Sequence, residues 1–207
     1  MHRSRILVLL AVVCVLVPCL AFAQDEDKPG QQAPPMSAEQ QAMMAAFERA
    51  MTPGTEHKML EAMAGEWTFT SKMWMDPAAP AQESSGTSSF KSILGGRFVQ
   101  HEHRGTMMGM PFEGIGLNGY DNLKKKFVST WIDNMGTMIV MSTGTFDPAT
   151  KTFTYTGEMD NPMLPGTTLK FRETLRAPDA DTAFMDWYEA RGNKEVKTME
   201  IVYKRKK

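Results

Sequence analysis

Two histidines, His101 and His103, stand one residue apart, and imidazole is the side chain that most often binds metal ions. On a β-strand both rings lie on the same face, a spacing that a metal site can use. The other histidine of the globular part, His57, falls in a helical segment and does not clearly supply a third ligand. The pair alone therefore does not predict a metal site.

Methionine sulfur is the other candidate ligand near this pair. Met107, Met108 and Met110 follow closely and could complete a soft site for Cu(I), and either histidine could instead bind haem. However, the chain contains 19 methionines, and methionine is a flexible filler of hydrophobic cores. We expect neither a metal ion nor another cofactor.

Carboxylates at alternating strand positions are the candidates for acid–base chemistry. Asp133 and Glu173 each share a strand face with large apolar residues, so both are expected to point inward. There they would orient the polar group of a ligand, or act as general acid and base. The alternative is an internal partner, such as an ion pair with Arg97 or a hydrogen bond to Tyr155.

Motifs for catalysis or cofactor binding are otherwise missing from the sequence. The glycines from Gly114 to Gly119 have dinucleotide-loop spacing, but a strand pattern follows where a helix would have to bind the pyrophosphate. Gly114 and Gly116 share one strand face instead and leave room for bulky neighbours or a ligand. No Gly-x-Ser-x-Gly sequence occurs, so we assign no catalytic residue and favour a binding protein over an enzyme.

Large aromatic side chains also fall at strand positions that face the predicted interior. Their rings bring apolar area and polar tips, which is the usual lining of a small-molecule site. Trp67 shares this pattern at the first strand. The predicted ligand-binding residues are Trp131, Asp133, Tyr155, Glu173, Trp187 and Tyr203.

The segments that must position these side chains alternate with a period of 2 from Gly65 to Tyr203. About ten short runs of β-branched and aromatic residues are separated by turn residues, such as those at 134–136 and 191–193. Such short connections join antiparallel neighbours, and a sheet of this size avoids exposed edges by closing. We predict an all-β fold over residues 65–207: a closed antiparallel up-and-down barrel of about ten strands.

Residues 36–64 have a helical period instead. Capping-box spacing at Ser37 predicts a helix from about Ala38 to Met51, and a second short helix starts near Glu56 and stops at Gly65. The apolar faces of both need a surface to cover. We expect these two short N-terminal helices to cap one end of the barrel.

The first 23 residues have the features of a cleavable export signal. Arg3 and Arg5 precede an apolar run that ends in small residues at 21 and 23, and the run is shorter than a membrane-spanning helix. We expect cleavage before Gln24 and a periplasmic or secreted protein. Residues 24–35 are acidic and proline-rich, which predicts a flexible leader.

The net charge of the exported part is small. Loss of the two signal arginines leaves 21 basic and 24 acidic residues, a formal charge of −3, which predicts no nucleic-acid partner. Both cysteines, Cys14 and Cys19, lie in the signal and lack the preceding small residue of a lipidation site, so we expect no stable membrane anchor. The basic run at 204–207 is expected to be a solvated strand end.

Several linked runs carry a resemblance to a known family. They lie at 107–114, 119–122, 129–133, 147–152, 157–159 and 197–201. Over about Pro53 to Lys206 the chain resembles the bacterial domain-of-unknown-function family numbered fifteen-seventy-nine, which has no established activity. More distantly, a helix followed by Gly65-x-Trp67 resembles the lipocalins and other calycins, which implies a lipocalin-like barrel that holds a small apolar molecule.

These observations favour an exported barrel that binds or carries a small apolar or amphipathic ligand. Two other hypotheses stay open. One is a small-substrate enzyme that uses Asp133 and Glu173 inside the barrel. The other is an envelope interaction module without a ligand, which would present the methionine face of the helix at 38–51.

Overall fold

The computed structural model describes residues 35–207. The predicted signal peptide lies outside the described residues, as does the predicted leader apart from its last residue. Two helices, α1 (Ala38–Met51) and α2 (Thr55–Glu61), precede the strands. The strands are β1 (Gly65–Met73), β2 (Gln82–Ile93), β3 (Phe98–Met107), β4 (Met110–Asp121), β5 (Lys126–Asp133), β6 (Val140–Asp147), β7 (Thr152–Asp160), β8 (Thr168–Arg176), β9 (Thr182–Arg191) and β10 (Lys194–Arg205). No helix among the described residues is long and apolar enough to cross a membrane.

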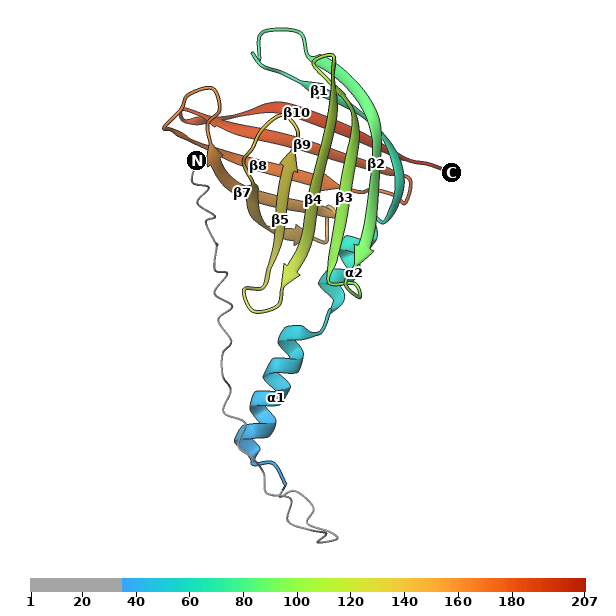
Figure 1. Cartoon of the computed structure of the whole chain (residues 1–207), viewed down its shortest axis with the longest axis vertical. Helices are drawn as coiled ribbons and strands as arrows, with labels where there is room; N and C mark the ends of the chain where they lie inside the picture. Colours follow the sequence, from blue (N-terminus) through green and yellow to red (C-terminus); the bar gives the residue numbers. More distant parts are fainter. Residues whose placement is uncertain (1–34) are drawn as a thin grey trace, which may run out of the picture. The chain divides into compact units, whose positions relative to one another are not determined.

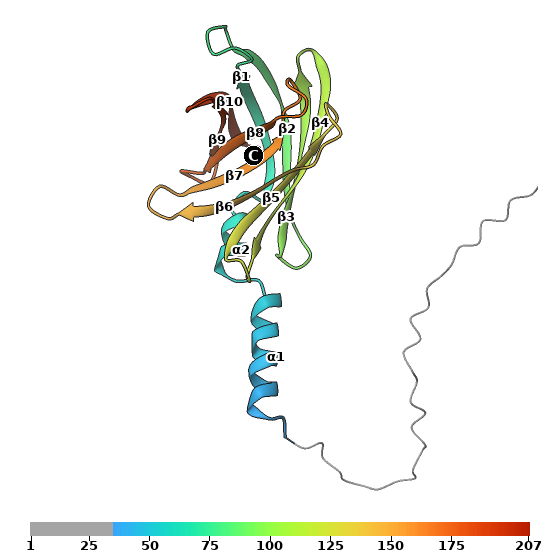
Figure 2. The same ribbon diagram turned by 90° about the vertical axis from the view of Figure 1, so that its left-hand side faces the viewer.

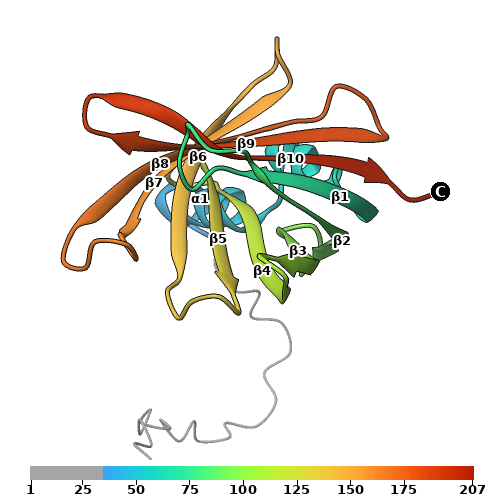
Figure 3. The ribbon, with the colours of Figure 1, turned by 90° about the horizontal axis from the view of Figure 1, so that it is seen from above.

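The ten strands form one closed antiparallel barrel, in which each strand pairs with the next and β10 pairs with β1 (Figures 1 and 3). This arrangement confirms the predicted up-and-down topology. Short turns account for it, because most connections are too short to reach any strand except an antiparallel neighbour. Closure also satisfies the hydrogen bonds of β1 and β10, which would otherwise be exposed edges.

One end of the barrel is covered by α2, which packs against β3 and β4 (Figure 2). Leu60 and Met63 from this region are buried in the hydrophobic core. His57 is also buried; its Nδ1 accepts a hydrogen bond of 3.0 Å from the backbone nitrogen of Gly54, and its ring meets Tyr120 edge-on at 5.8 Å. We call this end the closed end.

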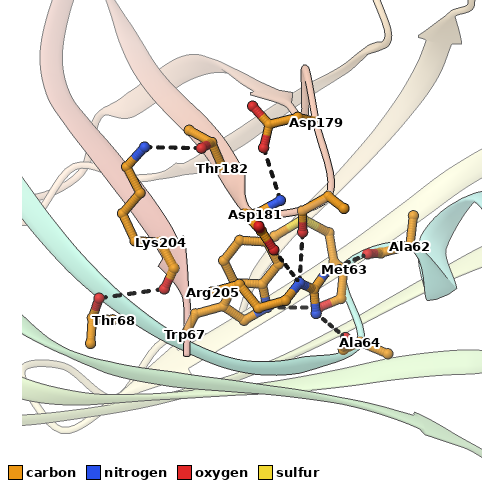
Figure 4. Close-up of polar contacts among 11 residues, drawn as sticks. Ala62, Met63, Ala64, Trp67, Thr68, Asp179, Asp181, Thr182, Lys204 and Arg205 are labelled. Atoms are coloured by element: carbon orange, nitrogen blue, oxygen red, sulfur yellow. Dashed lines mark hydrogen bonds and ion pairs between the residues drawn. The ribbon is translucent and has the colours of Figure 1, made fainter. Parts of the chain in front are cut away.

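Trp67 and Arg205 seal the closed end (Figure 4). The indole of Trp67 is fully buried, and its Nε1 donates a hydrogen bond of 2.9 Å to the carbonyl of Met63. The guanidinium of Arg205 lies 4.1 Å from the indole centroid and donates to the carbonyl oxygens of Ala62 and Ala64. These carbonyls follow α2, where the helix itself leaves them without partners. Arg205 therefore has a structural role that the prediction of a solvated strand end missed.

Glycine is required at the start of β1. Gly65 has a φ of +129°, a region that other residues rarely adopt, and a Cβ at this position would collide with the guanidinium of Arg205. The Gly65-x-Trp67 pattern thus has a direct physical reason. The glycine leaves room for the arginine side chain, and the guanidinium packs over the face of the tryptophan ring.

The first helix differs from the second, because α1 contains no buried residue. Its C-terminal end is held by Asn122, whose side-chain amide donates to the carbonyls of Arg49, Ala50 and Thr52. The large apolar residues of α1 remain exposed: Met43 64%, Met44 52%, Phe47 60% and Met51 51%. We expected both helices to cover the barrel end, but only the region of α2 contributes buried side chains.

The opposite end is formed by the connections after β1, β3, β5, β7 and β9, and its inward-facing side chains are less buried. Met159, Leu169, Trp187 and Met199 point inward by register, yet all four are partly exposed. No described helix packs over these residues. We call this end the open end.

Candidate functional site

His101 and His103 both point into the barrel, as their spacing predicts, with ring centroids 5.6 Å apart. The Nε2 atoms of both rings are buried and have no hydrogen-bond partner in the described part of the chain. Burial lowers the pKa of His101 to about 3, assisted by the neighbouring charge of His103, and burial lowers the pKa of His103 to about 4. Both imidazoles are therefore neutral at pH 7.

Two glycines on β4 make room for these rings and for Trp131. A Cβ at Gly116 would collide with the Nε2 of His101, and a Cβ at Gly114 would collide with the indole of Trp131. The glycine run is thus a packing feature of the barrel wall. β5 follows it, and no helix does, so the dinucleotide-loop interpretation is excluded by the structure as it was by the sequence.

Asp133 fixes the position of Trp131 near the open end. Its Oδ2 accepts a hydrogen bond of 2.8 Å from the indole Nε1, and its Oδ1 accepts one of 2.9 Å from the backbone nitrogen of Met135. Both carboxylate oxygens are therefore engaged. The role that the contacts indicate for Asp133 is to orient the indole.

Glu173 lies on the inner face of β8, opposite Tyr155 on β7 and Trp187 on β9. Burial raises its pKa to about 7. Glu173 is partly exposed and forms no hydrogen bond or ion pair with another residue in the described range, so neither of the expected internal partners is present. Arg97 instead donates to the carbonyls of Leu94 and Met51.

Tyr155 and Tyr203 connect Glu173 to the histidines. Burial, followed by the charge of Glu173, raises the pKa of both phenols. The ring of Tyr203 also lies 5.7 Å from that of His103. Polar groups therefore extend across the interior from β3 to β8. We call this set the polar layer: His101, His103, Tyr155, Glu173 and Tyr203.

Aromatic rings line the open half of the interior. Trp187 stacks on Phe171 with centroids 4.2 Å apart and planes at 13°, and Trp131 lies 5.4 Å from His101. Trp131 and Trp187 are partly exposed, whereas Tyr155 and Tyr203 are buried in the core. Of the predicted ligand-binding residues, Trp131, Asp133 and Trp187 thus lie near the opening, Tyr155 and Tyr203 lie in the buried core, and Glu173 lies between Tyr155 and Trp187.

Two hollows adjoin the open end. One of about 270 Å³ is lined by His103, Gly114 and Asp133 together with outward-facing residues of β3 to β5. The other, of about 450 Å³, includes Gly157 and Phe171 and lies where β8 and β9 separate. Most of the residues that line each hollow face outward, so both hollows lie in the outer surface of the barrel wall and neither is an enclosed central cavity.

The candidate metal ligands are not gathered at one point. Within residues 35–207, no three His, Cys, Asp or Glu side chains are placed to hold a metal ion. Met107, Met108 and Met110 lie at the β3–β4 turn, where Met108 is 49% and Met110 47% exposed, whereas the histidines lie in the barrel interior. The two inward carboxylates are also separate, since Asp133 is on β5 and Glu173 is on β8, and no contact between described residues joins them.

The histidines belong to this interior set although the predicted ligand-binding residues did not include them. The available signal was the alternation of Val99, His101 and His103, which places both rings on the face of a buried valine. Trp131 then contacts both rings, at 5.4 Å and 5.2 Å. Alternation alone does not show whether the histidines bind a metal ion or pack as interior polar groups. That distinction depends on the side chains that the neighbouring strands place beside them.

Comparisons with known proteins support the fold and the family. The crystal structure of Rv2717c from M. tuberculosis is similar at 14% identity with a TM-score of 0.53, over 75% of this chain and 100% of that one. A redesigned β-barrel matches at 17% identity with a TM-score of 0.38, over 72% and 96%. None of the curated proteins matches. The model of the family described as protein of unknown function (DUF1579) matches residues 52–205, and the chain therefore belongs to the DUF1579 family.

Proposed function

We propose that this protein binds or carries one small apolar or amphipathic molecule in the open half of its barrel. The apolar body of the ligand packs against Trp131, Phe171 and Trp187, and its polar group reaches the polar layer. Trp131 is held in place for this contact by Asp133. Preorganised aromatic walls above a few polar groups are the usual composition of a small-molecule site.

The observation that carries the proposal is the unpartnered imidazole nitrogen of His103 inside the barrel. The Nε2 atoms of His101 and His103 are buried, and His103 is only 5% exposed. A buried polar atom without a partner destabilises a fold by about 1–3 kcal/mol, so such atoms are normally paired. The Nε2 of His101 lies against Gly116 in the barrel wall. A ligand group that forms a hydrogen bond with the Nε2 of His103 would remove the penalty at His103.

A titration with a neutral apolar dye, N-phenyl-1-naphthylamine, tests the proposal. The purified protein is expected to enhance the dye's fluorescence with one-to-one saturation. Trp187→Ala is expected to weaken binding several-fold, because an aromatic contact contributes about 0.5–1.5 kcal/mol. Trp74→Ala is the matched control, since Trp74 follows β1 and packs beside Lys197. Absence of saturable binding, or an equal effect of the two substitutions, would refute the proposal.

Export remains part of the proposal and is supported by the sequence features of residues 1–23. N-terminal sequencing of the protein isolated from its own host tests it. The expected mature terminus is Gln24. A mature protein that retains Arg3 and Arg5 would contradict export by this signal.

A second candidate function, the interaction module, is favoured by the exposure of α1. Four large apolar side chains of this helix are more than half exposed, and none is buried. Exposed apolar surface of this kind often marks an interaction site. The double substitution Met44→Ser and Phe47→Ser separates the two functions. Ligand binding in the barrel predicts unchanged dye affinity, whereas dye bound by the helix would be lost in this variant.

A further inference from the structure

The charges inside the barrel indicate the chemical class of the ligand. We propose that the ligand is a cationic amphiphile, with an apolar body and a protonated amine that binds beside Glu173. This inference rests on the proposed function and makes it more specific. Its basis is the distribution of acidic and basic side chains over the two faces of the barrel wall.

Acidic side chains occur on the inner face of the open half. Asp133, Glu173 and Glu189 all point inward by register, through their pairing with Gly114, Tyr155 and Phe171. Asp133 is occupied by the indole of Trp131, so Glu173 is the inward carboxylate that is free to receive a ligand group. An ionised carboxylate in such a position needs a positive or hydrogen-bond-donating partner.

Basic side chains on the inner face of the described strands stand only at the barrel ends. Arg191 and Lys194 are exposed at the β9–β10 turn, and Arg191 lies 3.4 Å from Glu189, which offsets its charge. Arg205 is at the closed end, bonded to backbone carbonyls and to the indole of Trp67. No lysine or arginine therefore reaches the polar layer from the described strands.

The neighbours of Glu173 suit an ammonium group. An ammonium has three donors, and the neutral imidazole of His103 has a buried nitrogen without a partner in the described part of the chain. The phenols of Tyr155 and Tyr203 lie near the carboxylate, since its charge raises the pKa of both, and aromatic rings attract cations. A fatty acid or another anionic amphiphile would instead place its carboxylate beside Glu173 with no positive partner, which disfavours binding.

Three probes with the same ring system separate the outcomes: 2-(1-naphthyl)ethylamine, 2-(1-naphthyl)ethanol and 1-naphthylacetate. Each is titrated calorimetrically into the purified protein at about pH 8, above the pKa of about 7 of Glu173. The expected order of affinity is amine, alcohol, carboxylate. Glu173→Gln should weaken amine binding about tenfold, because a charge-assisted contact is lost, and leave the alcohol within about twofold.

Glu158→Gln is the matched control, since Glu158 lies on the outer face of the adjacent β7, 3.5 Å from Lys170. It should leave all three affinities unchanged. Binding of the carboxylate as tightly as the amine, or amine binding that is unaffected by Glu173→Gln, would overturn the cationic ligand and leave the proposed function intact. Failure of all three probes to bind would overturn both.

Discussion

The unpartnered carboxyl group of Glu173 makes the stability of this protein depend on pH in a specific direction. Burial raises its pKa from 4.5 to about 7 in the folded state. Between these values the unfolded chain loses the proton and the folded chain keeps it. The contribution of Glu173 to folding is therefore most favourable below pH 4.5 and is lost as the pH rises through 7.

Glu173→Gln removes this dependence, because glutamine has nearly the same shape and does not ionise. A shift of this size corresponds to about 3 kcal/mol, which is an upper bound for a partly exposed group. The variant should unfold with a free energy within about 1 kcal/mol of that of the wild type at about pH 5, and with one larger by about 2–3 kcal/mol at about pH 8. Urea denaturation at both pH values measures the difference, and the wild-type comparison cancels the titration of the histidines.

Glu158→Gln again serves as the control, because its exposed ion pair with Lys170 contributes no more than about 1 kcal/mol. A difference between Glu173→Gln and the wild type that is the same at both pH values would refute the reasoning. It would mean that the carboxyl group is ionised in the folded protein as readily as in the unfolded chain.

Three further predictions concern other parts of the barrel. Arg205→Ala should lower the free energy of unfolding by about 2–4 kcal/mol in urea denaturation, because three carbonyl contacts and the cation over the indole are lost, and a near-neutral effect would show that the closed end does not depend on it. Gly116→Ala should destabilise by about 1–3 kcal/mol through its collision with His101, and most of that loss should disappear in a His101→Ala background; additive effects would contradict the contact. Because the folded pKa of His101 is about 3 and that of His103 about 4, their neutral forms favour the folded state above pH 6.5, and this advantage is lost as the pH falls toward 4. His103→Phe should therefore show a shallower acid-induced loss of urea stability than the wild type, and parallel curves would argue against a neutral histidine.

The barrel was predictable from the sequence because its signals are local. Alternating residues and turn residues specify antiparallel neighbours. The predicted turn at 134–136 lies between β5 and β6, and the one at 191–193 begins at the last residue of β9 and leads into β10. The inward direction of Glu173 also follows from alternation alone. Its partners do not, because they are set by the register between strands that are distant in sequence.

The role of Arg205 could not be predicted for a similar reason. In sequence it is one of four consecutive basic residues, which is typical of a solvated end. Its contacts with Ala62 and Ala64 join positions more than 140 residues apart. The exposure of α1 could not be predicted either. An apolar helical period shows that the helix has an apolar face and does not show what that face packs against.

The central claim is that the open half of the barrel holds one small molecule. Native mass spectrometry of the protein purified from its own host tests this most directly. The account predicts a single one-to-one adduct that is released on unfolding and is absent from a Trp131→Ala, Trp187→Ala double variant. The bare mass of the chain, both as purified and after exposure to each of the three naphthyl probes, would contradict it.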